Sequence, residues 1–486
     1  MARIVIMGAG VAGHTAALHL RRQLGSGHTV TVVTPNAQWN WIPSNIWVGV
    51  GRMPKKKVLF PLAPLYRRKG IIYRQALARE IHPEGDADDP TPFIRIEHTA
   101  EPARGQTDRI PYDYLVNATG PKLNFAATPG LGPEQGGSVS VCTADHAEKA
   151  ADALGETLDR MRRGEHQTIV IGTGHGTCTC EGAAFEYTFN VEHTVRQAGL
   201  RDMCDIHYFT NEYELGDFGV AGLEFNQQGY RTNSRLWTES LFRERGVIPI
   251  VRAHARRVED GVLDYETLDG GFHQLHFDFA MLLPPFRGAD LTAVDRDGND
   301  ITSTMFSPNA MMYVDADYSG KDHDSWKASD WPRTYRSAAY DNIWAPGIAF
   351  APPHPISEPH VSPNGTVISP SPPRTGMPAG IQGKLVADTI TDRILRPGRP
   401  DRAESMTEMG SACIASAGSG LLTGSAASMT MYPTVPDHER YPGTGGRHRS
   451  LTFGEIGLAG HWIKTLLHHG FIYKMKGRPL WWLIPE

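Results

Sequence analysis

Cysteine and long apolar runs are both scarce in this sequence. Only 5 of its 486 residues are cysteine, at positions 142, 178, 180, 204 and 413. They are too few and too scattered for the disulfide scaffold of a small secreted protein, and are better interpreted as reactive or incidental thiols. No uninterrupted apolar run is long enough to cross a bilayer, so no transmembrane helix is expected. Attachment to a membrane surface stays open.

An excess of basic charge is also absent. The formal net charge of -5 gives no reason to expect nucleic acid as a partner. The N-terminal run MARIVIMGAGVAG has one arginine before apolar residues, but its glycine spacing favours a buried strand and turn over a cleaved signal peptide. With 40% hydrophobic and 21% charged residues, the composition is that of an ordinary globular protein, long enough for two or three domains.

The N-terminal segment has the pattern of a dinucleotide-binding fold. Arg3–Met7 is a predicted buried strand, followed by the glycine turn Gly8-x-Gly10-x-x-Gly13 and an amphipathic helix. These glycines allow a tight turn, close approach of the backbone to a pyrophosphate, and contact between helix and strand. Phosphate is favoured at the helix N-terminus by unpaired N–H groups and the helix dipole. The next strand, HTVTVVT, lacks the usual terminal acid for the ribose, so Thr34 and Asn36 are the neutral candidates.

Three later segments fit the same cofactor. YDYLVNATGPKLNF is a strand entering the turn Ala118-Thr119-Gly120, which is common in flavoproteins with two dinucleotide domains. NIWAPGIAFAPP is another buried strand, containing Gly347, and PPRTGMPAGIQGKLVADTI enters a helix at Thr375 and Gly376. Each alone is as readily an ordinary tight turn, but the four segments in this order predict FAD.

A second glycine turn, in HQTIVIGTGHGTCTCEGAAFEYTFN, departs from the motif. A β-branched strand over Thr168–Ile171 enters Gly172-x-Gly174, but the third glycine is replaced by Thr177. We expect the turn to keep its shape and to have lost a nicotinamide nucleotide. Cys180 lies at or near the N-terminus of the predicted helix EGAAFEYTFNVEHTVRQ, and a helix N-terminus favours the nucleophilic thiolate. The alternative is that Cys178 and Cys180 fill the core.

The segment around Cys180 resembles the central cysteine motif of the sulfide:quinone oxidoreductases, in the flavoprotein disulfide reductase superfamily. That motif is usually Cys-x-Gly-Pro-Ala-x-Glu, and this chain reads Cys180-Glu181-Gly182-Ala183-Ala184-Phe185-Glu186. FPLAPLYRRKGI, IPSNIWVGVG and SVCTADHAEKA are similar to the N-terminal domain of that family. SACIASAGSGLLTGSAASMTMYPTVPD is similar to its C-terminal cysteine segment, so the resemblance covers nearly the whole chain.

The resemblance implies oxidation of sulfide to polysulfide or elemental sulfur, with electrons passing through FAD to a membrane quinone. Cys180 and Cys413 would form the redox pair: sulfide attacks their bridge, one sulfur becomes a persulfide, and the other leaves as a thiolate that reduces the flavin.

Cys142 would be a third cysteine that shuttles sulfur, bonds the flavin methyl, or does neither. His146 matches a histidine proposed for acid–base work, or is a surface histidine. Glu186 is a proton acceptor or an ordinary helix carboxylate.

The chain departs from the family pattern at one further position. Asp217, in ELGDFG, stands where many members have a histidine, so a second imidazole base is in doubt.

The predicted fold class is α/β, with two Rossmann-like dinucleotide-binding domains and a C-terminal amphipathic helical region for membrane and quinone. We assign a discontinuous FAD-binding domain to residues 1–150 and 335–400. A second Rossmann-like domain, which carries a redox cysteine, is assigned to 151–334, and the membrane and quinone region to 401–486. No metal site is expected.

The last forty residues carry an apolar stripe at helical spacing, amphipathic aromatics, and basic residues that include Arg447, Lys464 and Lys474. This combination predicts a helix lying in a membrane interface, while the alternative is a helix packed on the core of the protein itself. Because a quinone is a membrane solute, Phe453, Phe471 and Tyr473 are candidate quinone contacts. We expect a peripheral, monotopic protein of a prokaryotic plasma membrane; a homo-oligomer stays open.

Three other functions stay open. The flavin subunit of a flavocytochrome c-type sulfide dehydrogenase would share the cysteine pair, but such subunits are exported, and neither a signal nor a Cys-x-x-Cys-His haem motif is present. A single-subunit NADH:quinone reductase has the same two-domain plan, but it needs an intact NADH turn and no thiols. The third is a redox-inert flavoprotein that binds sulfur species without turnover.

Overall fold

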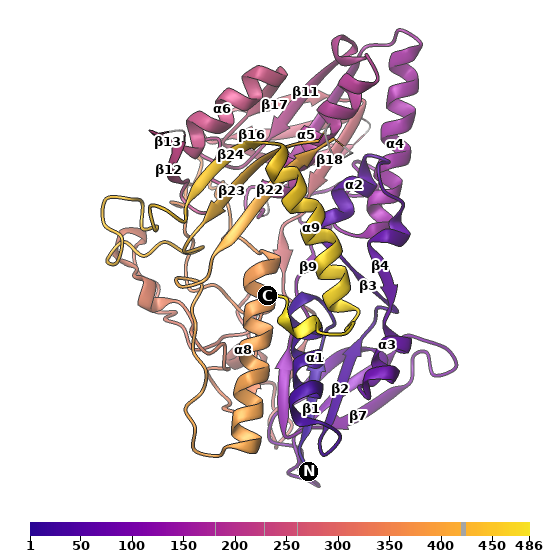
Figure 1. Ribbon diagram of the computed structural model, residues 1–486, viewed down its shortest axis with the longest axis vertical. Coiled ribbons are helices and arrows are strands. Elements are labelled where there is room, and N and C mark those ends of the chain that lie inside the picture. The colour runs from indigo at the N-terminus through magenta and orange to yellow at the C-terminus, as the bar shows by residue number, and fades with distance from the viewer. Residues whose placement is uncertain (180, 228, 260, 419–423) are drawn as a thin grey trace.

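A computed structural model describes residues 1–486 of the protein except 180, 228, 260 and 419–423. Two sheets with a parallel core and one antiparallel sheet near the C-terminus form its main layers (Figure 1). The predicted fold class, α/β with two Rossmann-like units, is confirmed by the parallel strand pairing in the first two sheets.

The first sheet is built around the N-terminal strand. Its order is β21-β8-β1-β2-β5-β6-β7; the first five strands are parallel, and β6 and β7 extend the sheet antiparallel. The strands are β1 (Arg3–Met7), β2 (Thr29–Thr34), β5 (Ile72–His82), β6 (Phe93–His98), β7 (Thr107–Pro111), β8 (Tyr114–Asn117) and β21 (Ile343–Trp344). Helices α1 (Val11–Leu24) and α8 (Gly376–Leu395) pack side by side (Figure 1). Segments far apart in the chain therefore meet at one sheet.

The second sheet is parallel throughout, with the order β14-β11-β10-β18. Its strands are β10 (Gln167–Thr173), β11 (Cys204–Phe209), β14 (Val247–Ile250) and β18 (Phe279–Leu283). The connections include α5 (Glu181–Gln197) and α6 (Ser234–Arg245), and α4 (Ala144–Arg162) precedes β10. Every residue of β18 is buried, as expected for a parallel strand that is covered on both faces.

The C-terminal region begins with a sheet that the sequence interpretation did not include. β22 (Ser411–Ala417), β23 (Ser425–Met431) and β24 (Phe453–Gly457) pair antiparallel and lead into α9 (Leu458–Met475). β22 and β23 are rich in serine and alanine, which carry little strand propensity. β22 packs against α5, and α9 packs against β22 and β23 (Figure 1).

One predicted strand is shorter than expected. NIWAPGIAFAPP forms regular strand only at Ile343–Trp344, and the rest of the segment is loop. Its three prolines explain the difference, because proline lacks the N–H needed for the ladder.

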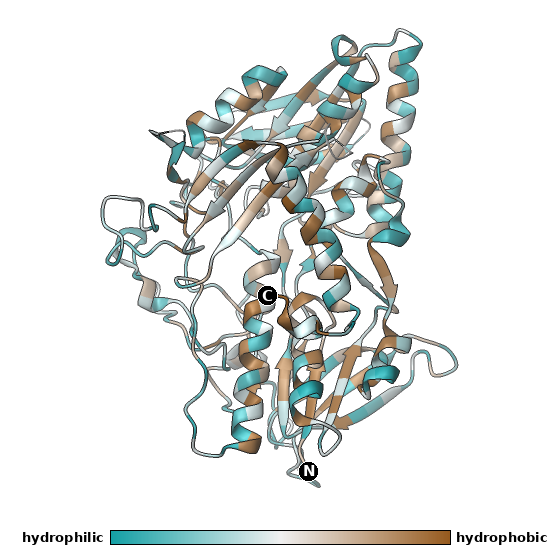
Figure 2. Cartoon of the chain, viewed as in Figure 1, coloured by the Kyte–Doolittle hydropathy of each residue, from teal (hydrophilic) through white to brown (hydrophobic). Residues whose placement is uncertain are grey.

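Within the described part of the chain, no helix has both the length and the apolarity required to cross a membrane. In Figure 2 the central strands of the first sheet are mostly brown, whereas brown and teal alternate along α8 and α9. This alternation is typical of helices with one apolar and one polar face.

Candidate active site

The first glycine turn and the Ala118-Thr119-Gly120 turn lie in direct contact. Gly8 has φ +96°, and a Cβ added there would lie 2.1 Å from the carbonyl oxygen of Ala118. A Cβ at Gly13 would lie 2.3 Å from the carbonyl oxygen of Gly8. At Gly10, by contrast, an added Cβ would have no atom within 4 Å. The turn is therefore tight where it packs and open where a pyrophosphate would approach the start of α1.

The segments after β21 and before α8 lie at the same edge of the first sheet as the first glycine turn. Gly347, with φ +80°, follows β21 and lies against Ala12, and its N–H donates to Gln382 Oε1 at 2.7 Å. α8 begins at Gly376, which is as open as Gly10. The hydroxyl of the preceding Thr375 is buried and has no hydrogen-bond partner in the described part of the protein. Two open helix N-termini and an unpaired buried hydroxyl fit an anionic dinucleotide such as FAD.

The remaining predicted cofactor residues lie at the ends of neighbouring strands. Thr34 ends β2, and its hydroxyl accepts from the N–H of Asn36 at 3.4 Å. Both the N–H and the hydroxyl of Thr119 donate to Asn117 Oδ1, at 3.3 and 2.8 Å. These bonds fix the turns after β2 and β8, on either side of β1.

The second glycine turn is closed by the protein itself. The N–H of Gly174 donates to the carbonyl of Leu283 at 2.7 Å, and that of Gly176 donates to His254 Nδ1 at 2.9 Å. A Cβ at Gly176 would lie 2.2 Å from the carbonyl oxygen of Val367. Because its N–H groups are used and a neighbouring segment covers it, this turn has no cradle left for a pyrophosphate. The geometry agrees with the expected loss of a nicotinamide nucleotide.

Cys413 lies against the first turn of α5. Its Sγ is 2.8 Å from the position that a Cβ on Gly182 would take, so a larger residue at 182 would collide with the thiol. Cys180, the predicted partner, lies outside the described residues; it directly precedes Glu181, the first residue of α5. Burial, together with the nearby charge of Glu186, raises the pKa of the Cys413 thiol to about 12, although Lys464 opposes this shift. Cys413 is therefore a protonated thiol at neutral pH in this environment.

A buried ion pair stands beside Cys413. Glu186 Oε2 lies 2.9 Å from the Nζ of Lys464 on α9, and Oε1 accepts from the N–H of Ser416 at 3.3 Å. Burial raises the pKa of Glu186, while Lys464 and the guanidinium of Arg52 oppose the rise. Arg52 donates to the carbonyl of Gly418 at 2.7 Å, and burial lowers its own pKa to about 10. Glu186 is thus a compensated charge in the core, linked directly to the C-terminal helix.

Lys464 is a site residue that the sequence interpretation missed. The sequence pattern groups it with a basic surface at the C-terminal end, but it is buried, as are Arg447 and Lys474. That part of the interpretation was wrong, because periodicity identifies an apolar stripe without showing which face turns inward. His461, Lys464 and His468 recur at helical spacing, and all three are buried. This polar stripe was the signal that could have identified the inward face.

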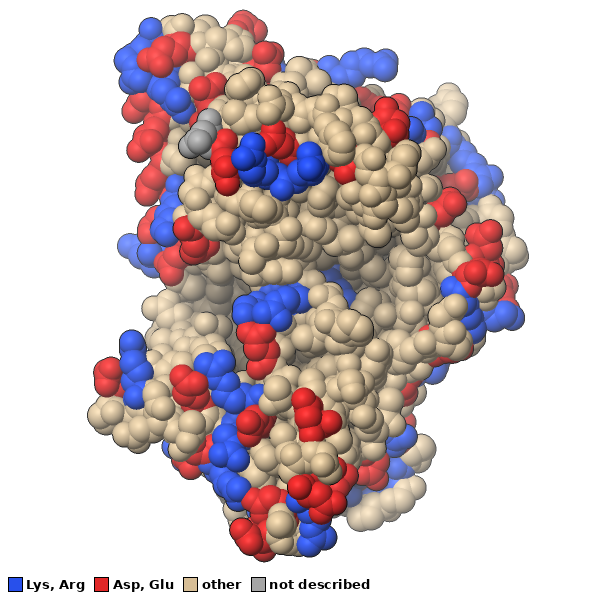
Figure 3. Space-filling model, turned by 180° about the vertical axis from the view of Figure 1, so that it is seen from behind, with Lys and Arg blue, Asp and Glu red and all other residues tan. Residues whose placement is uncertain are grey.

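The C-terminal helix turns its apolar side outward. Leu466 is 71% exposed, and Phe453 on β24 is 37% exposed. The other exposed apolar residues of this outer face are Leu451, Ile456, Trp462 and Ile463. Seen from behind in Figure 3, Lys, Arg, Asp and Glu lie in small mixed groups on a mostly uncharged surface. These exposed apolar side chains therefore lie on the outer side of β24 and α9 and of the segment just before β24.

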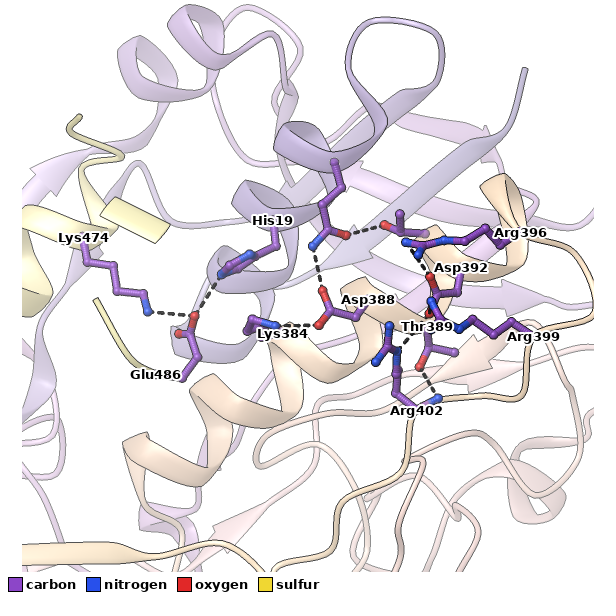
Figure 4. Close-up of polar contacts among 12 residues, drawn as sticks. His19, Lys384, Asp388, Thr389, Asp392, Arg396, Arg399, Arg402, Lys474 and Glu486 are labelled. Carbon is purple, nitrogen blue, oxygen red and sulfur yellow. Dashed lines mark hydrogen bonds and ion pairs between the residues drawn. The ribbon is translucent and has the colours of Figure 1, made fainter. Parts of the chain in front are cut away.

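The segment after α9 is anchored on the first nucleotide fold. Glu486 Oε1 lies 2.7 Å from Lys474 Nζ and 2.9 Å from His19 Nε2 of α1, as Figure 4 shows. Nearby on α8, Asp392 is surrounded by Arg396, Arg399 and Arg402 in the same view. The two ion pairs of Glu486 tie the end of the chain both to α9 and to α1, the helix that begins at the first glycine turn.

The third cysteine and the candidate histidine lie at the start of α4. Burial raises the pKa of the Cys142 thiol to about 11, and its N–H donates to Ser140 Oγ at 3.2 Å. His146 Nε2 lies 2.9 Å from Glu134 Oε1. No described contact joins either residue to Cys413.

The two remaining cysteines belong to the second sheet. Cys178 is buried and donates to the carbonyl of Leu283 at 3.1 Å. Cys204 lies on β11, where burial raises the pKa of its thiol to about 11. Both environments suit packed core thiols.

The three candidate quinone contacts have different surroundings. The ring of Phe471 is buried and stacks on Trp41, with centroids 4.9 Å apart and an interplanar angle of 12°. The hydroxyl of Tyr473 donates to the carbonyl of Pro479 at 2.9 Å. Phe453 alone of the three faces outward without a described ring partner.

A cavity of about 350 Å³ opens beside Thr179, the residue before Cys180. Tyr313 and Tyr318 line it from the long loop between β20 (Thr292–Ala293) and β21, and Ser371 and Arg374 line it from the segment before α8. The cavity is small and partly polar, and it reaches Thr179, two residues before α5.

Comparisons with known proteins give consistent matches. Residues 2–203 match the model of the pyridine nucleotide-disulphide oxidoreductase family. The sulfide-quinone reductase of Aquifex aeolicus is 26% identical over 473 residues, covering 97% of this chain and 91% of that protein. The crystal structure of the sulfide:quinone oxidoreductase from Aquifex aeolicus matches with a TM-score of 0.74 and 24% identity, over 98% of this chain and 92% of that chain.

A more distant structural match is NDH2 from Plasmodium falciparum in complex with NADH. It has a TM-score of 0.61 and 13% identity, over 99% of this chain and 97% of that chain. The predicted resemblance to the sulfide:quinone oxidoreductases is confirmed, and so is the predicted enzyme class, an FAD-dependent oxidoreductase.

Proposed function

We propose that this protein oxidises sulfide to polysulfide or elemental sulfur and passes the electrons through FAD to a membrane quinone. The observation that supports this best is the contact between Cys413 and Gly182. It brings a cysteine from the C-terminal sheet to the first turn of α5, two positions from Cys180. A thiol pair assembled from such distant segments is what sulfur transfer by disulfide exchange requires.

In this proposal hydrosulfide attacks a bridge between Cys180 and Cys413. One sulfur keeps the incoming atom as a persulfide, and the other leaves as a thiolate that carries the electron pair. FAD would be held by the turns at Gly8–Gly13, Ala118–Gly120 and Thr375–Gly376, and when bound it would supply a two-electron acceptor for the thiolate. Further sulfide lengthens the chain until it is released through the cavity beside Thr179.

The ion pair of Glu186 with Lys464 gives the thiols a charged neighbour in a dry site. The ammonium group of Lys464 lowers the cost of forming a thiolate at Cys413, because an opposite charge favours the ionised form. Since Lys464 belongs to α9, the helix that would touch the membrane also takes part in the redox site.

The exposed apolar face of β24 and α9 supports attachment to a membrane surface. Amphipathic helices of this kind lie in the interface with their apolar side among the acyl chains. A quinone dissolved in the bilayer would then approach from the α9 side. We retain Phe453, Phe471 and Tyr473 as candidate contacts and a peripheral membrane location as part of the proposal.

The main competing functions fit less well. An NADH:quinone reductase needs an open pyrophosphate turn in the second sheet, and here the N–H groups of Gly174 and Gly176 are already bonded within the protein. The flavocytochrome alternative rests on the same cysteine pair and is distinguished by its electron acceptor.

The test is an anaerobic titration of the purified, FAD-loaded protein. Sulfide should bleach the flavin absorbance, NADH should not, and a soluble quinone should restore the colour. Bleaching by NADH alone would overturn the proposal, and reoxidation by cytochrome c rather than quinone would favour the flavocytochrome alternative.

A further inference from the structure

Two long stretches of the chain contain no acidic residue. No Asp or Glu occurs before Glu80, and none occurs between Glu455 and Glu486. The first stretch nevertheless carries 12 Lys and Arg residues and the second carries 4, in a protein whose formal net charge is -5. Positive charge is therefore concentrated in two segments that lie at opposite ends of the sequence.

The fold brings these two segments together at the end of α9. The guanidinium of Arg68, on α3 (Leu62–Lys69), donates to the carbonyl of Lys476 at 3.3 Å, and the ammonium of Lys69 donates to the carbonyl of Gly477. These bonds hold α3 beside the C-terminal end of α9 (Figure 1). We call the cations gathered there the basic edge, which consists of Lys56, Lys57, Arg67, Arg68, Lys69, Lys476 and Arg478.

The cations of the basic edge have no acidic partners. In the described part of the protein none of them forms an ion pair with a carboxylate, whereas the neighbouring Lys55 is paired with two carboxylates of α4. They act on one another instead. Burial, and then the charges of Arg478 and Lys57, lower the pKa of Lys476. Like charges held together repel, and an anion bound among them would remove the repulsion.

The basic edge borders apolar side chains that are also exposed. In the tail after α9, Leu480 is 57% exposed and Leu483 is 67% exposed. Between them, the exposed ring of Trp482 has the guanidinium of Arg22 at 4.4 Å from its centroid. Leucines beside a tryptophan that is capped by a cation are typical of a segment at the level of lipid headgroups.

Resting on the membrane attachment proposed above, we propose that the basic edge binds the headgroups of anionic phospholipids, so that the protein selects negatively charged bilayers over uncharged ones. Such a bilayer matches both features of this surface. Its phosphate groups neutralise lysine and arginine, and its acyl chains accept the exposed leucines. A nucleic acid would neutralise the same cations but would leave the leucines in water.

The exposed positive charge comes mainly from a segment other than the C-terminal tail. Lys464 and Lys474, the lysines of the tail that precede Lys476, are buried in ion pairs with Glu186 and Glu486. Residues 55–69 supply most of the exposed cations next to α9. Selection of anionic lipid is consequently a property of the folded surface, and an isolated C-terminal helix would lack most of it.

The test is co-sedimentation of the purified, FAD-loaded protein with liposomes. One set contains phosphatidylcholine alone, and the other contains phosphatidylcholine mixed with phosphatidylglycerol. Wild type should bind the mixed liposomes about tenfold or more tightly at low salt, and added salt should reduce this preference. Lys57→Gln/Arg478→Gln removes two exposed cations, so it should bind the mixed liposomes about tenfold or more weakly and the uncharged ones as wild type does.

Arg162→Gln/Arg243→Gln is the matched control. It removes the same charge from exposed positions on α4 and α6, which lie at the other end of the molecule from α3 (Figure 1), and it should bind as wild type does. FAD content and circular dichroism show whether each variant is folded. Should the test variant not fold, the preference of wild type between the two liposomes decides alone.

Equal binding of wild type to both liposomes would overturn the lipid selection and leave membrane attachment intact. Wild-type binding by Lys57→Gln/Arg478→Gln would remove the basic edge as its cause. Binding to neither liposome would overturn the attachment as well, while the sulfide titration tests the redox chemistry separately. Binding to a short DNA duplex without binding to liposomes would assign the basic edge to nucleic acid and contradict the proposal.

Discussion

Two buried glutamates near the start of α5 differ in whether a cation compensates their charge. Glu186 is buried but compensated by Lys464 and Arg52, whereas Glu181 is buried with no partner among the described residues. A compensated pair fixes charge next to Cys413, and an uncompensated acid stores a proton instead. At the residue scale, the start of α5 therefore has one carboxyl group held beside a cation and one that burial keeps protonated.

Glu212 should make the stability of the protein depend on pH. Its pKa is about 7 in the folded state, above that of an ordinary glutamate, so the native state binds the proton more tightly than the unfolded state. This stabilisation is fully present below about pH 4.5 and is lost as the pH rises through about 7, a change of about 3 kcal/mol. Urea unfolding at several pH values should show this slope in wild type relative to Glu212→Gln. An equal pH dependence in both proteins would contradict it.

Gly10 should matter for the cofactor but not for the fold. Nothing lies within 4 Å of a Cβ at this position, so Gly10→Ala should leave the apoprotein as stable as wild type. The added methyl group would meet the pyrophosphate, and the Kd for FAD should rise about tenfold or more. Fluorescence titration of apoprotein with FAD measures this, with Gly27→Ala, an equally open glycine in a surface turn, as control. Unchanged FAD affinity in Gly10→Ala would remove this turn from the cofactor site.

The roles of the residues in the glycine turns were predictable, because local geometry requires a glycine at each of these positions. The contact of Gly8 with Ala118 follows from a motif whose strand order is known in advance. The contact of Cys413 with Gly182, and the burial of Glu181 and Glu212, could not be derived from local pattern. They depend on how β22 docks on α5, which no spacing within either segment encodes.

At the scale of elements, the bounds of α5 were predictable from the sequence, whereas the orientation of α9 was not. The helix predicted from EGAAFEYTFNVEHTVRQ is observed at Glu181–Gln197, because its boundaries coincide with local signals. The helix predicted near the C-terminus exists as α9, but Lys464 and Lys474 point inward, toward Glu186 and Glu486. A buried polar stripe and an exposed apolar stripe give the same periodicity as the reverse arrangement, so sequence alone could not orient the helix.

The outward apolar face of α9 should determine binding to lipid. Leu466→Asp replaces a 71% exposed side chain, so folding should be unaffected. Losing the burial of one leucine in the interface costs about 1.5–3 kcal/mol, so vesicle affinity should fall at least about tenfold. Co-sedimentation with liposomes measures the bound fraction. Leu236→Asp is the matched control, because Leu236 is 56% exposed on α6, away from this face. Equal binding by both variants and wild type would exclude α9 as the contact.

Across the whole molecule, the C-terminal sheet is the part that joins the two nucleotide-type folds into one site. Cys413 and Ser416 on β22 contact α5, and Lys464 reaches the same place from α9. The tail after α9 is tied to α1 through Glu486 and His19. The two Rossmann-like units were predictable from their repeated strand–turn–helix pattern. The three-stranded sheet was not, because its small residues lack strand propensity and its partners are remote.

The central claim, that Cys180 and Cys413 work as one redox pair, is tested most directly by peptide mass spectrometry of the holoenzyme. The oxidised protein is alkylated and digested under non-reducing conditions, before and after anaerobic addition of sulfide. The account predicts that peptides containing residues 180 and 413 are joined through a disulfide, or through a bridge with added sulfur, before sulfide is added. After sulfide they should separate, with a persulfide on one of them. Finding both cysteines alkylated in an oxidised enzyme that sulfide still reduces would contradict the account.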